Sequence, residues 1–273
     1  MEIGIFAKTF AGTDPAAVLS AVRDAGYACA QFNLACAGLP SMPDAVAPET
    51  ISAIAAASRD SGVRLAALSG TYNMAHPDEA VRADGLRRLA VVIEAAADLS
   101  IPLVTLCTGT RHPDDQWAHH PDNATPSAWA DMRKQMEQAL QLAERHGVDL
   151  GIEPEQANIV TSATDAMRLI AEMGSPRLRV VLDPANLFEA STPAEARAIV
   201  ADAVERTAGH VALAHAKDRM PDGRFAAAGR GVVDFADFVA RLRATGFDGP
   251  LITHGLTEEE APGVARFLNG AVR

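Results

Sequence analysis

Eight short apolar segments, separated by longer segments of helical composition, constrain this 273-residue chain more than any other feature. The apolar segments are predicted strands at residues 2–7, 28–33, 63–69, 102–107, 148–153, 178–183, 210–215 and 250–255. Strands that alternate with helices predict a parallel sheet, and eight strands suffice to close such a sheet into a barrel. Because the length also suits one α/β barrel, we predict a single (β/α)8 domain over residues 1–273.

The segments between the predicted strands carry helix signals. Residues 86–98 and 127–146 place apolar side chains at helical spacing. Asp14, Thr161 and Thr192 are predicted helix starts. Glycine follows a helix and precedes a strand six times, which is a helix stop signal, at Gly26, Gly62, Gly147, Gly174, Gly209 and Gly246. An open doubly wound sheet is the alternative fold, but no G-x-G-x-x-G motif follows the first strand.

Charge and composition exclude several classes of protein. The net charge is −11, with no run of basic residues, so we expect no nucleic acid partner. The three cysteines are too few and too scattered for a disulfide framework or a zinc ribbon. No signal peptide and no apolar stretch of membrane-spanning length is visible. We therefore expect a cytoplasmic protein that does not enter a membrane.

The ends of four successive predicted strands carry residues suited to binding a metal. They are Glu153 in GIEPE, Asp183 in VVLDPANL, His215 in VALAHAKD and His254 in PLITHGL. The carboxyl ends of parallel strands meet on one face of a barrel, where its site is built. Two carboxylates and two imidazoles suit Mn²⁺, Co²⁺, Fe²⁺ or Zn²⁺ better than Mg²⁺ or Ca²⁺. Structural alternatives remain, because the carboxylates can cap helices and the imidazoles can bond to the backbone.

Further polar residues on the loops after these strands are candidates for substrate contact. Asn186 and Lys217 follow the strand-end ligands closely, Glu155 lies just past the fifth strand, and His76 lies in the loop segment NMAHP. Each has an alternative role that the sequence leaves open. Asn186 can cap a helix, Lys217 can pair with a local carboxylate, Glu155 can be a solvated charge, and His76 can lie on the surface.

Taken together, these motifs resemble the xylose isomerase-like TIM barrels, also described as the sugar phosphate isomerase/epimerase superfamily. The similar segments are IEPE at 152–155, VLDPANL at 181–187, HAKD at 215–218, G-R-G-x-x-D at 229–234 and GPLITHGL at 249–256. The resemblance covers nearly the whole chain. It implies a divalent metal, most often Mn²⁺ or Co²⁺, held by the four strand-end residues, and a ketose, inosose or related polyol as substrate. It also implies a homo-oligomer.

The sequence departs from this family at two positions. The ketose 3-epimerases of the family carry a glutamate on the last strand, which serves as a second base, whereas this chain has His254. They also carry a histidine three residues after the strand-six aspartate, where this chain has Asn186. We therefore expect an imidazole in place of the second carboxylate base.

The residues and the resemblance together predict a metal-dependent isomerase or epimerase that removes a proton next to a metal-bound carbonyl, giving an enediolate. Glu153 is the predicted base, and His254 or a metal-bound water is predicted to return the proton or to protonate a leaving group. Lys217 and Arg230 are predicted to hold hydroxyls or a phosphate of the substrate. A dehydratase or lyase acting on a keto-sugar, keto-inositol or 3-keto-glycoside shares the first step and is the alternative. Two further alternatives are a non-catalytic sugar-binding barrel and an apurinic-site endonuclease of the same superfamily, against which the acidic charge argues.

Overall fold

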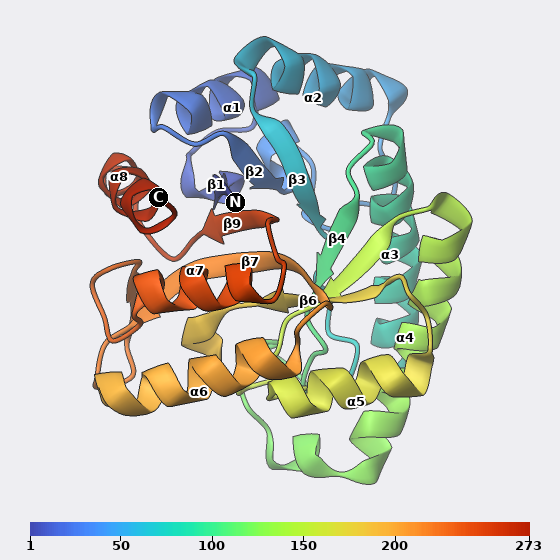
Figure 1. Ribbon diagram of the computed structural model, residues 1–273. Coiled ribbons are helices and arrows are strands. Elements are labelled where there is room, and N and C mark those ends of the chain that lie inside the picture. Colours follow the sequence, from blue (N-terminus) through green and yellow to red (C-terminus); the bar gives the residue numbers. More distant parts are fainter.

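The computed structural model describes residues 1–273 as a closed barrel of eight parallel strands inside a ring of eight helices (Figure 1). The barrel strands are β1 (Glu2–Phe6), β2 (Cys29–Phe32), β3 (Arg64–Ser69), β4 (Leu103–Leu106), β5 (Asp149–Ile152), β6 (Leu178–Leu182), β7 (Val211–Arg219) and β9 (Pro250–Thr253). Each strand pairs with its sequence neighbour, β6 pairs with β7, and β9 pairs with β1 to close the ring. The predicted barrel and its eight strand segments are confirmed.

The eight helices cover the outside of the barrel (Figure 1). They are α1 (Pro15–Asp24), α2 (Pro48–Ser61), α3 (Glu79–Asp98), α4 (Pro126–His146), α5 (Ala163–Met173), α6 (Pro193–Arg206), α7 (Phe235–Ala244) and α8 (Ala261–Ala271). Four short 3-10 helices lie in loops, at Ala7–Thr9, Leu34–Ala37, Pro121–Ala124 and Pro184–Asn186. None of the helices is both long and apolar enough to span a membrane.

Local chemistry explains most helix ends. Asp14 and Thr192 cap α1 and α6 as predicted, each accepting a hydrogen bond from a backbone N–H of the first turn. The predicted start at Thr161 is wrong by one residue. Ser162 is the N-cap of α5, accepting from Asp165 N, whereas the Thr161 hydroxyl donates to the Asp165 carboxylate. Gly147 ends α4 at a φ of +72°, a left-handed conformation that favours glycine.

The seventh strand differs from its predicted bounds. It was expected to end at residue 215, but β7 continues to Arg219 and forms an antiparallel hairpin with β8 (Phe225–Ala227). The segment between the two strands, residues 220–224, carries the turn residues Pro221, Asp222 and Gly223. The hairpin extends the barrel wall beyond the carboxyl ends of the strands.

Apolar residues fill the barrel and the layer between strands and helices. One cluster of 69 buried residues joins the helices to the sheet. A separate cluster consists of strand residues alone, at Cys29, Ala66, Ala67, Leu103, Val181, Leu213 and Ile252. A Cβ atom at Gly4 would collide with the Ile252 side chain, so the chains approach too closely there for any other residue. With this packed interior below them, the polar side chains gather at the carboxyl ends of the strands.

A candidate metal centre at the carboxyl ends of the strands

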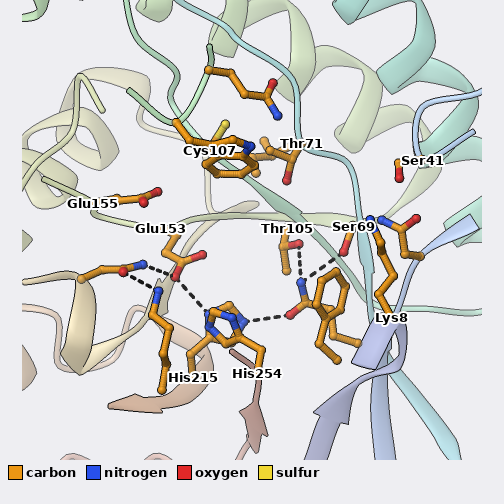
Figure 2. Close-up of a pocket in the computed structure, with 18 of the residues that line it drawn as sticks. Lys8, Ser41, Ser69, Thr71, Thr105, Cys107, Glu153, Glu155, His215 and His254 are labelled. Atoms are coloured by element: carbon orange, nitrogen blue, oxygen red, sulfur yellow. Dashed lines mark hydrogen bonds and ion pairs between the residues drawn. The ribbon is translucent and has the colours of Figure 1, made fainter. Parts of the chain in front are cut away.

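Four side chains from four strands converge at one end of the barrel. Glu153 follows β5, Asp183 follows β6, His215 lies within β7 and His254 follows β9. One potential ligand atom from each lies within 4.8 Å of those of the other three. His215 Nδ1 is 3.0 Å from Glu153 Oε1, and His254 Nε2 is 3.1 Å from Asp183 Oδ2. Figure 2 shows Glu153, His215 and His254 lying together. The structure thus brings together the four residues that the sequence analysis singled out.

The backbone around Asp183 explains why one of its oxygens faces the cluster. Asp183 is the N-cap of the 3-10 helix Pro184–Asn186, and its Oδ1 accepts a hydrogen bond of 2.9 Å from Ala185 N. Its Oδ2 is then left for His254 and for Lys217 Nζ, which is 3.3 Å away. Asp183 therefore has both roles: Oδ1 caps the 3-10 helix, and Oδ2 belongs to the cluster of candidate ligands.

Burial and mutual charge set the protonation of the two carboxylates. Burial raises the pKa of Glu153, but the charges of His215 and Lys217 outweigh it and hold the pKa below its ordinary value. Burial likewise raises the pKa of Asp183, and Lys217 and His254 more than offset it. Both carboxylates are therefore ionised at neutral pH, as metal ligands must be.

The pKa values of the two imidazoles shift in opposite directions, upward for His215 and downward for His254. Burial lowers the pKa of His215, but the adjacent charges of Glu153 and Asp183 raise it above the ordinary value. Burial lowers the pKa of His254, and the positive charge of His215 lowers it further. The rings lie with their centroids 4.5 Å apart. His254 therefore favours the neutral form that binds a cation.

Lys217 and Asn186 join the cluster directly. Lys217 Nζ donates to Asn186 Oδ1 at 2.6 Å, and Asn186 Nδ2 donates to Glu153 Oε1 at 2.7 Å. Both side chains are buried. An amide that donates to the Glu153 carboxylate also fixes the direction in which this carboxylate points.

The cluster opens into a cavity of about 550 Å³. Besides Glu153, Asn186, His215, Lys217 and His254, the cavity walls include Phe6, Lys8, Gln31, Asn33, Ser41, Ser69, Thr71, Thr105, Leu106, Cys107, Gln116, Trp117, Glu155 and Phe225. Figure 2 shows Glu155 beside Glu153 and Lys8 near Ser41 on the other side. Burial and the charge of Glu153 raise the pKa of Glu155 to about 7. Polar side chains thus line much of a space of the size that holds a small molecule.

Two residues predicted to contact substrate lie outside this cavity. The His76 ring is held on the protein surface, where its Nδ1 accepts from Asp78 N at 3.0 Å and its Nε2 lies 2.9 Å from Pro113 O. Arg230 lies beyond β8 and lines a separate hollow near α8. The sequence could not show this, because loop composition does not reveal which side of a loop a residue occupies.

Several cavity residues were not predicted from the sequence. Gln31 comes from β2, Ser69 from β3 and Thr105 from β4, and all three are polar side chains buried among apolar strand residues. A polar residue in a buried strand is a signal, because it needs a partner there. Lys8 carries no comparable signal, because a charged side chain after a strand is most often simply exposed to solvent.

The donor set of the cluster fits a divalent cation. Two ionised carboxylates and two imidazoles offer mixed oxygen and nitrogen ligands from rigid strand ends. The carboxylates pair with Lys217 and with the imidazoles. The residues present are therefore compatible with Mn²⁺, Co²⁺, Fe²⁺ or Zn²⁺.

Comparison with known proteins agrees with the geometry. A family model described as a xylose isomerase-like TIM barrel matches residues 19–269. The L-ribulose-5-phosphate 3-epimerase UlaE of Salmonella paratyphi C (strain RKS4594) is 25% identical over 206 residues, which cover 73% of this chain and 67% of that protein. UlaE of Escherichia coli (strain K12) is 25% identical over 199 residues, covering 71% of this chain and 65% of that protein. The chain thus matches about two thirds of the length of these relatives.

Solved structures share the fold over nearly the whole chain. The apo form of 3-keto-D-glucoside 4-epimerase YcjR from E. coli superposes with a TM-score of 0.77 at 17% identity, covering 99% of both chains. The structure of L-ribulose 3-epimerase superposes with a TM-score of 0.76 at 19% identity, covering 99% of this chain and 94% of that chain. At such identities the likeness establishes the fold alone.

Proposed function

The chain belongs to the xylose isomerase-like TIM barrel family, and on this premise we propose that it is a divalent-metal-dependent isomerase or epimerase of keto-sugars or related polyols. The observation that carries the proposal is the convergence of Glu153, Asp183, His215 and His254, three of which line a polar cavity. The two UlaE relatives, which are named as L-ribulose-5-phosphate 3-epimerases, support the reaction class.

In the proposed reaction, the four residues hold the cation, with Mn²⁺ as the expected ion. A bound divalent cation would polarise a carbonyl of the substrate and stabilise negative charge that develops on its oxygen. Glu153 is the base that removes a proton from the carbon next to this carbonyl. Its carboxylate is ionised at neutral pH, and Asn186 orients it.

His254 is proposed to return the proton. Its Nε2 faces Asp183, whereas its Nδ1 makes no hydrogen bond within the protein. One ring can thus offer Nε2 to a cation and keep Nδ1 for a proton. Delivery to the neighbouring carbon gives an isomer, and delivery to the opposite face of the same carbon gives an epimer. Glu153 then releases the proton it removed to solvent, and His254 regains its Nδ1 hydrogen from solvent, which restores both groups for the next turnover.

Three residues are proposed to contact the substrate from the cavity wall. Lys217 can donate to a hydroxyl or carbonyl oxygen, since an ammonium carries three hydrogens and has two partners here. Asn186 and Glu155 line the same cavity. The cavity wall therefore offers both donors and acceptors to a polyhydroxylated substrate.

The test is proton exchange from keto-sugars in D₂O. Protein loaded with Mn²⁺ is incubated in D₂O with ribulose, psicose, tagatose or fructose. Mass spectrometry then measures the deuterium content of the recovered sugar. We expect deuterium in at least one sugar, and a loss of about 10²–10⁴-fold in exchange rate for Glu153→Gln. The surface variant Glu137→Gln on α4 should exchange at the wild-type rate.

Metal content measured for each variant separates loss of the base from loss of the cation. Wild-type exchange by a metal-loaded Glu153→Gln protein would remove Glu153 as the base. A product lighter by one water would indicate the dehydratase alternative. No exchange and no product with any keto-sugar would contradict the proposed function.

A further inference from the structure

A buried amide lies directly behind the candidate metal centre. Gln31, on β2, is only 6% exposed. Its Nε2 donates to Ser69 Oγ at 3.2 Å and to Thr105 Oγ1 at 3.1 Å, and its Oε1 lies 2.8 Å from His215 Nε2. Dashed lines in Figure 2 join Ser69, Thr105 and the His215 ring through this amide. The amide hydrogens therefore point to β3 and β4, and the amide oxygen points to β7.

The two nitrogens of the His215 ring face different surroundings. Nδ1 faces the cluster, 3.0 Å from Glu153 Oε1 and 4.0 Å from Asp183 Oδ2, whereas Nε2 faces Gln31. An imidazole binds a cation only through a nitrogen that carries no hydrogen. Because a neutral ring has one hydrogen, binding through Nδ1 requires the hydrogen on Nε2, and a buried N–H requires an acceptor.

We propose that Gln31 is a positioning residue that keeps His215 in the tautomer with hydrogen on Nε2, so that Nδ1 presents its lone pair to the cation. The proposal rests on the proposed function, since it assumes that the cluster binds a metal. The acceptor required by Nε2–H is Gln31 Oε1. Partners of this kind orient a ligating histidine and raise its basicity.

In the observed orientation of Gln31, the amide hydrogens face the hydroxyls on β3 and β4 and the amide oxygen faces His215. If the amide were reversed, its NH₂ group would face His215 Nε2, which would then have to accept, and the hydrogen would move to Nδ1. That tautomer cannot bind a cation through Nδ1. Ser69 and Thr105 both serve as acceptors for the two amide hydrogens in the observed orientation, which leaves Oε1 for the ring.

Metal affinity of three variants tests the proposal. Zn²⁺ binding is measured by competition with a chromophoric chelator for wild type, Gln31→Leu and Gln31→Glu. We expect Gln31→Leu to bind about 10- to 100-fold more weakly. Gln31→Glu retains an acceptor for Nε2–H and should bind within about threefold of wild type or more tightly. Gln135→Leu is the matched control, since Gln135 is also a buried glutamine but accepts from Tyr72 Oη instead.

The tautomer itself is read by ¹⁵N NMR of the histidines in Zn²⁺-loaded wild-type protein. We expect His215, assigned by comparison with a His215→Gln variant, to show a protonated Nε2 and a metal-bound Nδ1. This readout needs no variant of Gln31 and no activity, so it remains decisive if Gln31→Leu fails to fold. A protonated Nδ1, or binding through Nε2, would overturn the proposal.

The measured Zn²⁺ affinities distinguish failure of the proposed metal centre from failure of the proposed role of Gln31. Absence of Zn²⁺ binding in wild type would contradict the metal centre and hence the proposed function. Binding by wild type with equal affinity in Gln31→Leu would overturn only the role of Gln31. Equal losses in Gln31→Leu and Gln31→Glu would also overturn it, because the acceptor would then not be what matters.

Discussion

The ammonium group of Lys217 lies 3.3 Å from Oδ2 of Asp183, a carboxylate whose side chain has no exposed surface. The same Oδ2 lies 3.1 Å from His254 Nε2, one of the atoms that would bind a cation. Lys217 therefore neutralises part of the negative charge of the centre when no metal is bound. A divalent cation would share Asp183 with this ammonium, and the two positive charges would oppose each other.

The first prediction follows from this shared carboxylate. Lys217→Met should lower the free energy of unfolding of the metal-free protein by about 3 kcal/mol, because it removes the ammonium group that pairs with a buried carboxylate. The same variant should bind Mn²⁺ more tightly than wild type, because a competing positive charge has gone. Urea unfolding and calorimetric titration measure the two effects.

Lys134→Met provides the control for this prediction. The Lys134 ammonium pairs with Glu79 at 3.4 Å on the surface, and both side chains are more than half exposed. Loss of such a pair should change stability by less than about 1 kcal/mol. Weaker Mn²⁺ binding by Lys217→Met would contradict the competition between the two cations.

The second prediction concerns removal of the metal. Addition of Mn²⁺ at 100 times its dissociation constant should raise the free energy of unfolding by about 2.7 kcal/mol, and a chelator should reverse the gain. Asp183→Asn should abolish the gain, whereas the helix-surface variant Asp202→Asn should keep it. Scanning calorimetry with and without Mn²⁺ provides the measurement. An equal gain in Asp183→Asn would place the cation elsewhere.

The third prediction concerns the β7–β8 hairpin. Both oxygens of the buried Asp218 carboxylate accept backbone N–H groups at 2.8–3.0 Å, from Arg219, Gly229, Gly231 and Val233. Asp218→Asn should cost at least about 2 kcal/mol of stability, because the amide NH₂ cannot accept and leaves buried donors unpaired. Urea unfolding measures this loss. Asp222→Asn, at the exposed hairpin tip, should have little effect.

Because Phe225 on β8 lines the cavity, a loosened hairpin should also weaken substrate binding. We expect KM to rise in Asp218→Asn while Mn²⁺ affinity stays at the wild-type value. A loss of Mn²⁺ affinity comparable to the rise in KM would show that Asp218 supports the ligands rather than the hairpin.

The fourth prediction is a pH dependence of stability. Burial raises the pKa of the Cys36 thiol to about 11, whereas an unfolded cysteine titrates near pH 8.5. The folded thiol keeps its proton when the unfolded one has lost it, so its stabilising contribution is complete below about pH 8.5 and is lost as the pH rises towards 11. From pH 8.5 to 10, this one group should lower the free energy of unfolding by on the order of 1–2 kcal/mol.

Urea unfolding under reducing conditions at several pH values checks this slope. Cys36→Ala should show a shallower decline than wild type over the same interval. Burial raises the pKa values of Cys29 and Cys107 to about 12, so these thiols add to the remaining decline. Identical slopes for wild type and Cys36→Ala would contradict the prediction.

The barrel was predictable because each strand is short, apolar and followed by a helix with clear start and stop residues. The β7–β8 hairpin was not, because its pairing joins Lys217 to Ala227 across a polar segment in which neither strand alternates clearly. The shift of the α5 cap from Thr161 to Ser162 has a similar cause. Two adjacent hydroxyl residues both suit an N-cap, and only the backbone geometry decides between them.

The place of the four strand-end residues was predictable because parallel strands deliver their ends to one face. Loop residues carried no such constraint, which is why His76 and Arg230 were expected in the cavity but lie elsewhere. Gln31 was overlooked for a different reason. Its strand is four residues long and buried throughout, so no alternation in the sequence shows which way the amide points.

Pairing of β1 with β9 closes the barrel, so the candidate metal centre can serve as a reporter of that closure. The four candidate ligands lie on or directly after the last four barrel strands, β5, β6, β7 and β9. His254 follows β9, the strand whose pairing with β1 closes the barrel. A nascent or truncated chain that ends before β9 has at most three of the four donors. Binding of the ion should therefore begin only when β9 has paired with β1. A pulse of Zn²⁺ added during refolding would time this closure of the barrel, and circular dichroism would time helix formation separately.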